Sequence, residues 1–258
     1  MSTENALPPH YLPAPDLLRG RVILVTGAGQ GIGRTAALAF AAHGATVVLQ
    51  GRRPRKLEAV YESIQQSGWP EPAMVPIDLN AATDAEFERL ADTIEVELGR
   101  LDGIVHSAVL FDGLKRLTDL PLDHWLAALR VNLAAPAAVN RACGPLLAAA
   151  PDAAVILTGE THGLSPSAFW GAFAVSKAGL AALTRIQAEE WAQHPHLRIN
   201  LLVPGPVRSP QRARSHPAEA PEALPPPESL MPWYLYFIGP ASRGRTGEII
   251  RCGPSAAP

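Results

Sequence analysis

The sequence predicts one α/β domain: a doubly wound parallel sheet of about seven strands with helices on both faces. Short apolar runs alternate with helical stretches along the chain, which is the pattern of β-α-β units. The chain has 258 residues, of which 47% are hydrophobic and 18% charged, and this suits one sizeable core. A glycine-rich turn also joins the first apolar run to the first helical stretch, as in Rossmann-type sheets.

The expected elements follow in chain order. Apolar runs predict strands near residues 22–26, 46–50, 73–77, 103–107, 153–158, 197–203 and 247–251. Helical periodicity predicts helices near 31–43, 54–67, 84–98, 122–149 with a break near Asn132 to Pro136, 166–193 and 228–238. We expect the domain to span 18–253, after an extended arm over 1–17 and before a tail over 254–258. Right-handed crossovers between the strands would place helices on both sheet faces.

Proline is unusually frequent, with 26 residues, about twice ordinary usage. Many lie in the arm and in the segment 204–227. Because proline interrupts helices and central strands, that segment is predicted to be a loop or lid. It is either a disordered insertion or a cover over a ligand, and the residues alone favour neither.

Charge and cysteine content narrow the function classes. A net charge of -2 offers no basic field for nucleic acid. No apolar run is long enough for a membrane span, and residues 1–10 lack the features of a signal peptide. Cys143 and Cys252 are far apart, which suits a reducing cytoplasm. Neither they nor the eight scattered histidines have a metal-ligand spacing, so we expect no metal.

The turn from Thr26 to Gly33 predicts a nucleotide site. Its spacing is G-x-x-x-G-x-G through Gly27, Gly31 and Gly33, since Ile32 stands where G-x-G-x-x-G would need its third glycine. Glycines let the backbone turn sharply and approach a pyrophosphate at the helix N-terminus. A turn without ligand is the alternative, and the flanking strand and helix make it the weaker interpretation.

The residues after the second expected strand indicate which nucleotide binds. Dinucleotide folds usually have a carboxylate there to hold the ribose hydroxyls, whereas this chain has Arg52 and Arg53. A guanidinium can grip a 2′-phosphate through two hydrogen bonds. We therefore expect NADP(H) in preference to NAD(H), with an exposed helix start as the alternative. Asp78 and Leu79, after the third strand, are placed to meet the adenine.

From about residue 18 to 253 the pattern resembles the short-chain dehydrogenase/reductase family. Asn132 resembles its helix asparagine, which holds a water in a proton relay, and Pro204-Gly205 its motif beside the nicotinamide. Segments 16–18, 170–172 and 231–232 look most like the YciK-like bacterial branch. With the motifs above, the resemblance implies a cofactor-binding set of Thr26, Gly27, Gly29, Gln30, Gly31, Ile32, Gly33, Arg52, Arg53, Asp78, Leu79, Ser107, Ala108, Lys177, Pro204, Gly205, Val207 and Ser209.

The chain departs from that family at the catalytic signature Tyr-x-x-x-Lys. The matching segment keeps Lys177, which in the family binds the nicotinamide ribose and lowers the tyrosine pKa, but Phe173 stands at the tyrosine position. Phenylalanine keeps the ring and lacks the oxygen that passes the proton.

Two further departures lie nearby. Glu160 stands where the family has a serine that polarises the substrate carbonyl, and an ionised carboxylate cannot donate that hydrogen bond. Glu160 could pair with Lys177, or a one-residue shift could bring in Thr161. In the segment 106–109, Val109 replaces a glycine that lies close to the cofactor.

Two main hypotheses follow. The first is an NADP(H)-dependent oxidoreductase for a small carbonyl or alcohol, of weak or altered activity, with Glu160 and His162 as candidate acids. The second is an inactive pseudoenzyme that senses nucleotide or acts as a scaffold. A different chemistry with Glu160 as base is a third, weaker idea, and His162 could be an ordinary loop residue.

The resemblance also implies a homodimer or homotetramer, packed through the long helices near 134–149 and 166–193. Alanines along these helices would permit close approach, although alanine is as common in an ordinary core. The substrate is not identified by the sequence. Its pocket wall is expected to include the apolar side chains of Leu110, Phe111, Phe169 and Trp170.

Overall fold

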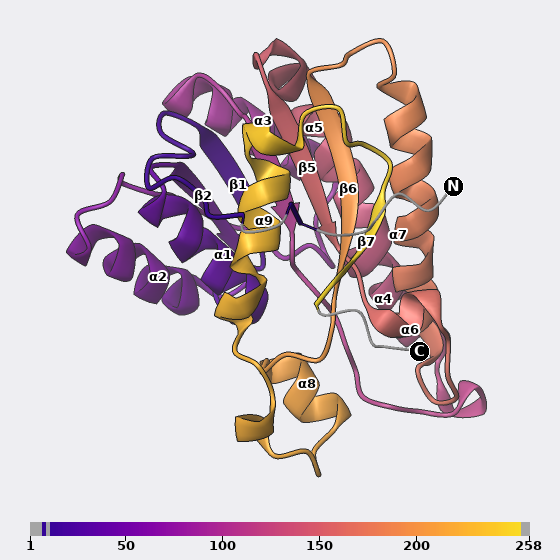
Figure 1. Cartoon of the computed structure of the whole chain (residues 1–258). Coiled ribbons are helices and arrows are strands. Elements are labelled where there is room, and N and C mark those ends of the chain that lie inside the picture. Colours follow the sequence, from indigo (N-terminus) through magenta and orange to yellow (C-terminus); the bar gives the residue numbers. More distant parts are fainter. Residues whose placement is uncertain (1–6, 9–10, 254–258) are drawn as a thin grey trace.

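The computed structural model describes residues 7–8 and 11–253. The described part of the chain forms a seven-stranded, all-parallel sheet in the order β3-β2-β1-β4-β5-β6-β7. The strand order reverses between β1 and β4, where a doubly wound sheet opens a crevice for a ligand. Figure 1 shows the sheet with its helices, and the predicted fold class is confirmed.

The strands lie within about two residues of their predicted positions. They are β1 (Val22–Thr26), β2 (Thr46–Gly51), β3 (Ala73–Pro76), β4 (Gly103–His106), β5 (Ala153–Thr158), β6 (Leu197–Pro204) and β7 (Ile249–Cys252). Every residue of β1, β4, β5 and β6 is buried. Apolar runs without alternation therefore mark the centre of the sheet, which helices cover on both sides.

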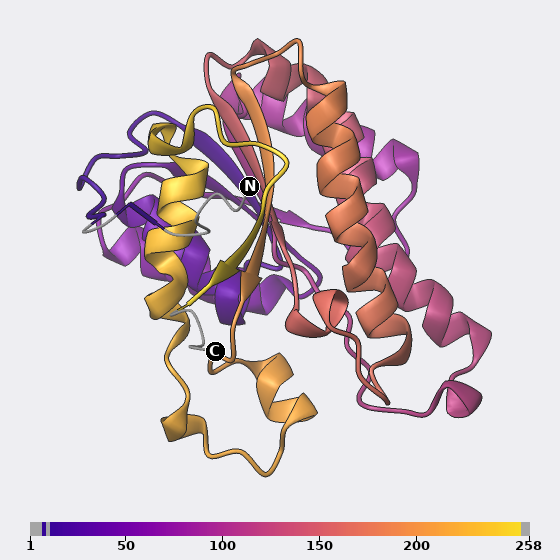
Figure 2. The same cartoon turned by 45° about the vertical axis from the view of Figure 1, so that its right-hand side comes forward.

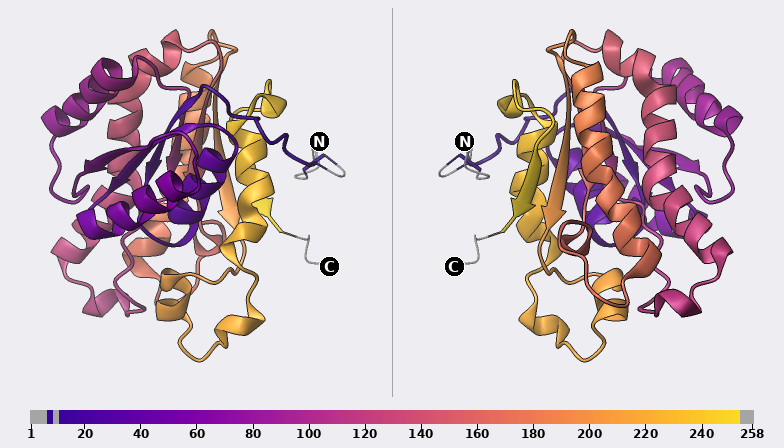
Figure 3. Two further views of the ribbon diagram at one scale, coloured as in Figure 1. Left: turned by 90° about the vertical axis from the view of Figure 1, so that its left-hand side faces the viewer. Right: turned by 90° about the vertical axis from the view of Figure 1, so that its right-hand side faces the viewer.

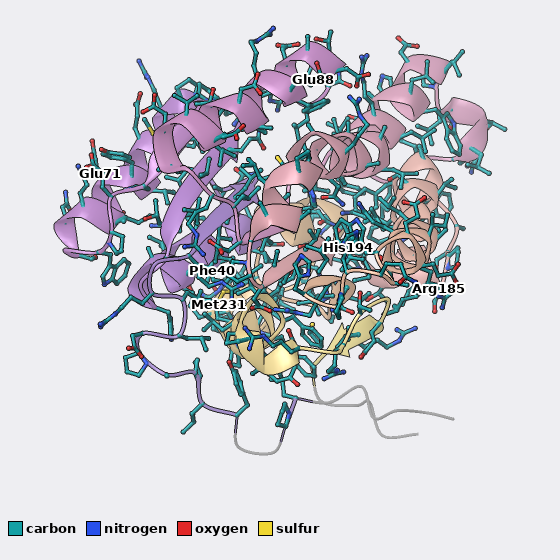
Figure 4. The ribbon with its side chains drawn as sticks, turned by 90° about the horizontal axis from the view of Figure 1, so that it is seen from above. Phe40, Glu71, Glu88, Arg185, His194 and Met231 are labelled. Atoms are coloured by element: carbon teal, nitrogen blue, oxygen red, sulfur yellow. The ribbon has the colours of Figure 1, made fainter. Side chains whose placement is uncertain are left out.

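The helices form two layers (Figures 2 and 3). One layer holds α1 (Gly31–Ala42), α2 (Pro54–Gln66) and α9 (Met231–Ile238). The other holds α3 (Asp84–Leu98), α4 (Leu122–Leu129), α5 (Ala135–Ala149) and α7 (Gly171–Glu190). Viewed from above, Phe40 and Met231 lie in the interior of the first layer, while Glu71, Glu88 and Arg185 lie at the periphery (Figure 4).

The predicted break near Asn132 to Pro136 is present as an interruption of the regular α-helix. Arg130–Ala134 forms one π-helical turn that joins α4 to α5 without a gap. The amide of Ala135 donates to the carbonyl of Arg130. Pro136 has no N–H to offer the carbonyl of Asn132, so a wider turn accommodates the proline and keeps the helix running.

The segment 204–227, which was predicted to be a loop or lid, contains short helical pieces. This segment includes α8 (Pro210–Ser215) and a 3₁₀ turn (Pro221–Ala223), and a second 3₁₀ turn (Pro227–Leu230) leads into α9. Pro210 occupies the first turn, where its missing N–H costs nothing, and Ser209 Oγ accepts from the amide of Arg212 at 3.1 Å. In Figure 1, α8 projects beyond the carboxyl ends of the strands.

The helix predicted over 166–193 begins later, at Gly171. A short helix, α6 (Thr161–Leu164), precedes it. Between them Phe169 has a φ of +73°, a left-handed conformation that ends any regular helix for a bulky residue.

The extended arm predicted over 1–17 is only partly present in the described residues. Residues 15–20 form turns, and the amide of Leu17 donates to the carbonyl of Ala14 at 3.0 Å. Leu7, Tyr11 and Leu17 pack against the core of the first layer, and this burial explains why the chain folds back. Residues 1–6, 9–10 and the predicted tail lie outside the described residues.

Candidate functional site

A cavity of about 700 Å³ lies at the carboxyl ends of the strands. It runs from the glycine turn, across the end of β2, to α8 and the loop after β5. The predicted site residues that line it are Gly27, Gly29, Gln30, Gly31, Ile32, Arg52, Arg53, Asp78, Leu79, Ser107, Ala108, Glu160, His162, Lys177, Pro204, Gly205, Val207 and Ser209. Val109 and Thr161 line it as well, and Val109 is 38% exposed.

Four predicted residues, Thr26, Gly33, Asn132 and Phe173, do not line this cavity. Thr26 Oγ1 accepts from the amides of Ser107 and Ala108, each at 3.2 Å, and so fixes the end of β4 against β1. A Cβ on Gly33 would lie 2.5 Å from the carbonyl oxygen of Gly27. Thr26 and Gly33 therefore support the conformation of the glycine turn on the side away from the cavity.

The glycine turn leaves room that a side chain would fill. A Cβ on Gly27 would lie 2.7 Å from the Cα of Ala108, and Gly27 and Gly31 have φ values of +69° and +55°. Helix α1 starts at Gly31, and the side chain of Gln30 does not cap it. Its first amides are thus available to an anion at the helix N-terminus, which fits a pyrophosphate.

The adenosine end of the cavity is basic. Arg52 and Arg53 line it, and no carboxylate among the described residues forms an ion pair with either. Lys56 also lines it and donates to Gln30 Oε1. Lys56 was not predicted as a site residue from the sequence. Its position about one turn after Arg52, in the first turn of a helix, could have indicated that it faces the same ligand.

Gln50 was also missed, and it carries an unsatisfied acceptor. Its amide nitrogen donates to the carbonyl of Ile77 at 2.8 Å, while its buried Oε1 has no partner. Buried polar atoms are nearly always hydrogen-bonded. This free acceptor beside Arg52 fits a ligand that brings hydrogen-bond donors, as an adenosine does.

Lys177 is buried at the other end of the cavity. Its Nζ donates to the carbonyl of Thr158 at 2.9 Å. Burial lowers the pKa of this ammonium to about 8, and the negative charge of Glu160 partly opposes that shift. At neutral pH it remains a positive donor between the ends of β5 and α7.

The carboxylate of Glu160 contacts His162 and Gln211. Its Oε1 lies 3.1 Å from His162 Nδ1, and its Oε2 accepts from Gln211 at 3.4 Å. The imidazole of His162 is stacked on the indole of Trp170. Among the described residues, Glu160 and Lys177 do not form the ion pair that the sequence allowed; the Lys177 ammonium on α7 donates instead to the carbonyl of Thr158 in β5.

Phe173 lies behind this end of the cavity, in an aromatic cluster with Phe111 and Trp170. Its ring is 5.0 Å from that of Phe111 and edge-on to it, and Phe173 is only 5% exposed. It lines a second, smaller cavity of about 310 Å³, together with Phe169. Of the four predicted apolar wall residues, Leu110, Phe111 and Trp170 line the main cavity and Phe169 does not.

Asn132 is buried in the π-helical turn, next to the aromatic cluster. Its Oδ1 accepts from the amide of Leu110 at 2.7 Å, and its Nδ2 donates to the carbonyl of Leu110 and to Ser176 Oγ. Both amide hydrogens are therefore used by the protein. The side chain of Asn132 ties the loop after β4 to α7.

His106 was not predicted to act in the site. It is fully enclosed at the end of β4, where Nε2 lies 2.8 Å from Asn140 Oδ1, and Asn140 donates in turn to Gln187. Burial lowers the pKa of this imidazole to about 4, and the charge of Lys177 adds to that effect. His106 is thus a neutral group below the site.

The segment around α8 adds polar residues that sequence reasoning did not assign: Gln211, Arg212, Arg214, Ser215 and His216 line the cavity. The only sequence feature that could have indicated their place in the cavity is that they follow the carboxyl end of β6. Among the described residues, no group of three or more His, Cys, Asp or Glu side chains is arranged to hold a metal. No helix there is long and apolar enough to cross a membrane.

A doubly wound parallel sheet with a cavity at the carboxyl ends of its strands is the architecture of Rossmann-type α/β proteins, the dehydrogenases among them. The family model for short chain dehydrogenases matches residues 21–220, and the chain belongs to that family. Uncharacterized oxidoreductase YciK from Escherichia coli K12 is 36% identical over 249 residues, which cover 96% of this chain and 98% of YciK. The chain is thus an oxidoreductase-family protein similar to YciK.

Solved structures agree in fold. A short chain dehydrogenase from Shigella flexneri has a TM-score of 0.92 at 36% identity, covering 96% of this chain and 97% of that chain. A structure from Escherichia coli CFT073, solved in complex with NADPH, has a TM-score of 0.90 at 36% identity and covers 94% of this chain and all of that one.

Proposed function

We propose that this chain is an NADP(H)-dependent oxidoreductase for a small carbonyl or alcohol, in which His162 and Glu160 replace the usual tyrosine in proton transfer. The observation that carries the proposal is the contact between His162 and Glu160 in the same cavity as Lys177. When bound, NADP(H) would supply or accept the hydride. The NADPH complex of the similar Escherichia coli structure supports this cofactor.

The proton path follows from the geometry of the pair. A protonated His162 donates through Nδ1 to the carboxylate of Glu160, which holds the ring in place. Its other ring nitrogen is then a donor for a substrate oxygen. Lys177 would contact the nicotinamide ribose, as the family resemblance implies, and its positive charge would favour a developing oxyanion.

For the cofactor, Arg52 and Arg53 would hold the 2′-phosphate, and the glycine turn would hold the pyrophosphate. Asp78 and Leu79 would contact the adenine. Pro204, Gly205, Val207 and Ser209 would bound the nicotinamide end, next to Ser107 and Ala108 at the end of β4. All of these roles were predicted from the sequence.

A specific observation favours a second candidate, a nucleotide-binding protein without catalysis. Phe173 is buried among aromatic rings and cannot pass a proton. If the His162–Glu160 pair does not reach the substrate, binding of NADP(H) would serve sensing or scaffolding.

One experiment separates the candidates. NADPH binding is measured by fluorescence, followed by NADPH oxidation with a panel of carbonyl compounds, for the wild type, Phe173→Tyr and Phe173→Tyr with Glu160→Ser. Turnover by the wild type supports the oxidoreductase. Binding without turnover, with activity appearing only in the double variant, supports the inactive candidate, and failure to bind any nicotinamide cofactor contradicts both.

We also propose that the protein is a cytoplasmic homodimer or homotetramer. Exposed apolar side chains on α4 and α7 support an oligomer: Leu122, Leu126, Val175 and Ile186 are each at least half exposed. Light scattering coupled to gel filtration would measure the mass, and Val175→Glu with Ile186→Glu should shift it to the monomer. A monomeric wild type would contradict this proposal.

A further inference from the structure

The segment around α8 places two basic side chains over the aromatic cluster. The guanidinium carbon of Arg214 lies 5.7 Å from the ring centroid of Phe111. The ring of His216 lies 6.0 Å from that of Trp170. Both residues line the main cavity at the end opposite Arg52. A cation therefore lies next to flat apolar surface, within the part of the cavity where a substrate would bind.

Arg214 differs from its neighbour Arg212 in having no counter-charge. Arg212 forms two hydrogen bonds to the carboxylate of Glu219, at 2.6 and 2.8 Å. No carboxylate among the described residues lies within ion-pair distance of Arg214. The guanidinium keeps its full fork of donors for an added group.

The carboxylate of Glu160, which also lines the cavity, is already engaged. Glu160 is bound by His162 through one oxygen and by Gln211 through the other. Lys177 adds a second positive charge deeper in the cavity. This end of the cavity therefore has an excess of positive charge, which would attract an anion and repel a cation.

Arginine also suits the surroundings. A guanidinium is weakly hydrated, lies well against aromatic rings and binds a carboxylate through two parallel hydrogen bonds. The rings of Phe111 and Trp170 are 5.6 Å apart and tilted by 34°. They offer a wall for a flat apolar body whose charged end would reach Arg214.

We propose that Arg214 selects the substrate, and that the substrate is a carbonyl compound with a flat apolar body and a carboxylate. Only the carbonyl group in this proposal rests on the proposed function; the carboxylate and the apolar body are inferred from Arg214, Phe111 and Trp170. Arg214 binds the carboxylate, Phe111 and Trp170 contact the body, and the carbonyl points toward Lys177 and His162.

The test compares 4-carboxybenzaldehyde with benzaldehyde, two probes that differ in the carboxylate. Binding of NADP⁺ is measured first, and each aldehyde is then titrated by calorimetry into NADP⁺-saturated protein. We expect 4-carboxybenzaldehyde to bind the wild type at least about tenfold more tightly, as befits a charge-assisted bidentate hydrogen bond. Arg214→Ala should remove the difference in affinity between the two aldehydes, and Arg214→Lys should retain only part of it.

Arg208→Ala is the matched control, because Arg208 is an exposed arginine of the same segment that does not line the cavity. It should leave both affinities unchanged. Equal affinity of the wild type for the two aldehydes, lack of binding of 4-carboxybenzaldehyde, or an equal loss in Arg208→Ala would each overturn the proposal. Absence of NADP⁺ binding would contradict the proposed function instead; binding of 4-carboxybenzaldehyde through Arg214 would still be measured on the free protein.

Discussion

The imidazole of His162 lies flat against the indole of Trp170, with ring centroids 3.6 Å apart and planes inclined by 13°. This contact fixes the ring plane, while Glu160 engages one ring nitrogen. A histidine held in this way is oriented before a ligand arrives. The structure places His162 in α6 and makes it a better candidate for proton transfer than the loop residue considered from the sequence.

His162→Gln should lower kcat by about 10²-fold or more, because a general acid commonly contributes that much. NADPH affinity should change little, since the cofactor is expected to contact other residues. The measurement is NADPH oxidation under saturating cofactor. His194→Gln, a change at an exposed histidine outside the cavity, serves as the control, and full activity of His162→Gln would remove this residue from the mechanism.

Arg52→Ala should weaken NADPH binding by about 10- to 100-fold, the value of one or two charge-assisted hydrogen bonds to a phosphate. NADH binding should stay the same, because NADH lacks the 2′-phosphate. Fluorescence titration with each cofactor gives the ratio of the NADPH affinity to the NADH affinity. Arg55→Ala, a nearby arginine that does not line the cavity, should leave the ratio unaltered; a parallel loss for NADH would argue against a phosphate contact at Arg52.

Gly33→Ala should impair both stability and NADPH binding. The added Cβ would lie 2.5 Å from the carbonyl oxygen of Gly27, so the glycine turn must move. We expect at least a tenfold loss of NADPH affinity. The control is Gly144→Ala in α5, which lies outside the cavity and where a Cβ meets nothing within 4 Å apart from its chain neighbours; this change should leave NADPH affinity unaltered. Unchanged NADPH binding in Gly33→Ala would mean that the turn is not the cofactor site.

His106 should make the protein less stable as the pH falls from about 6.5 toward 4. Burial lowers its folded-state pKa to about 4, so below pH 6.5 the unfolded chain binds a proton that the folded chain does not. Linkage then removes about 2 kcal/mol of the free energy of unfolding between pH 7 and pH 5. Urea unfolding at pH 7 and pH 5 should show a smaller change in the free energy of unfolding for His106→Gln than for the wild type. An equal change in the two proteins would refute the lowered pKa of His106.

The parts of the fold that the sequence predicted well depend on neighbouring residues. The glycine turn and the strand before it lie within one short segment, and an unbroken apolar run identifies a central parallel strand. The π-helical form of the turn at Asn132 and the capped helix α8 were not predicted. In both, local packing and a serine cap accommodate a proline that sequence rules treat as an interruption.

The partners of Glu160 could not be predicted for a different reason. The sequence allowed a pair with Lys177, but a carboxylate pairs with whichever donor the backbone brings near. His162 and Gln211 are those donors. Likewise, nothing in the sequence related Arg214 to Phe111, since only the return of the chain after β6 places them together.

By itself, the sequence determined the parallel α/β fold, the glycine turn with Arg52 beyond it, and the absence of a hydroxyl at Phe173. These properties follow from residue type and short-range spacing, which the chain carries in any conformation. Only the tertiary structure decided which side chains share the cavity: His162 on Trp170, Arg214 over Phe111, and Lys177 on the carbonyl of Thr158. Such contacts join distant segments, and their geometry exists only once the sheet and both helix layers have packed.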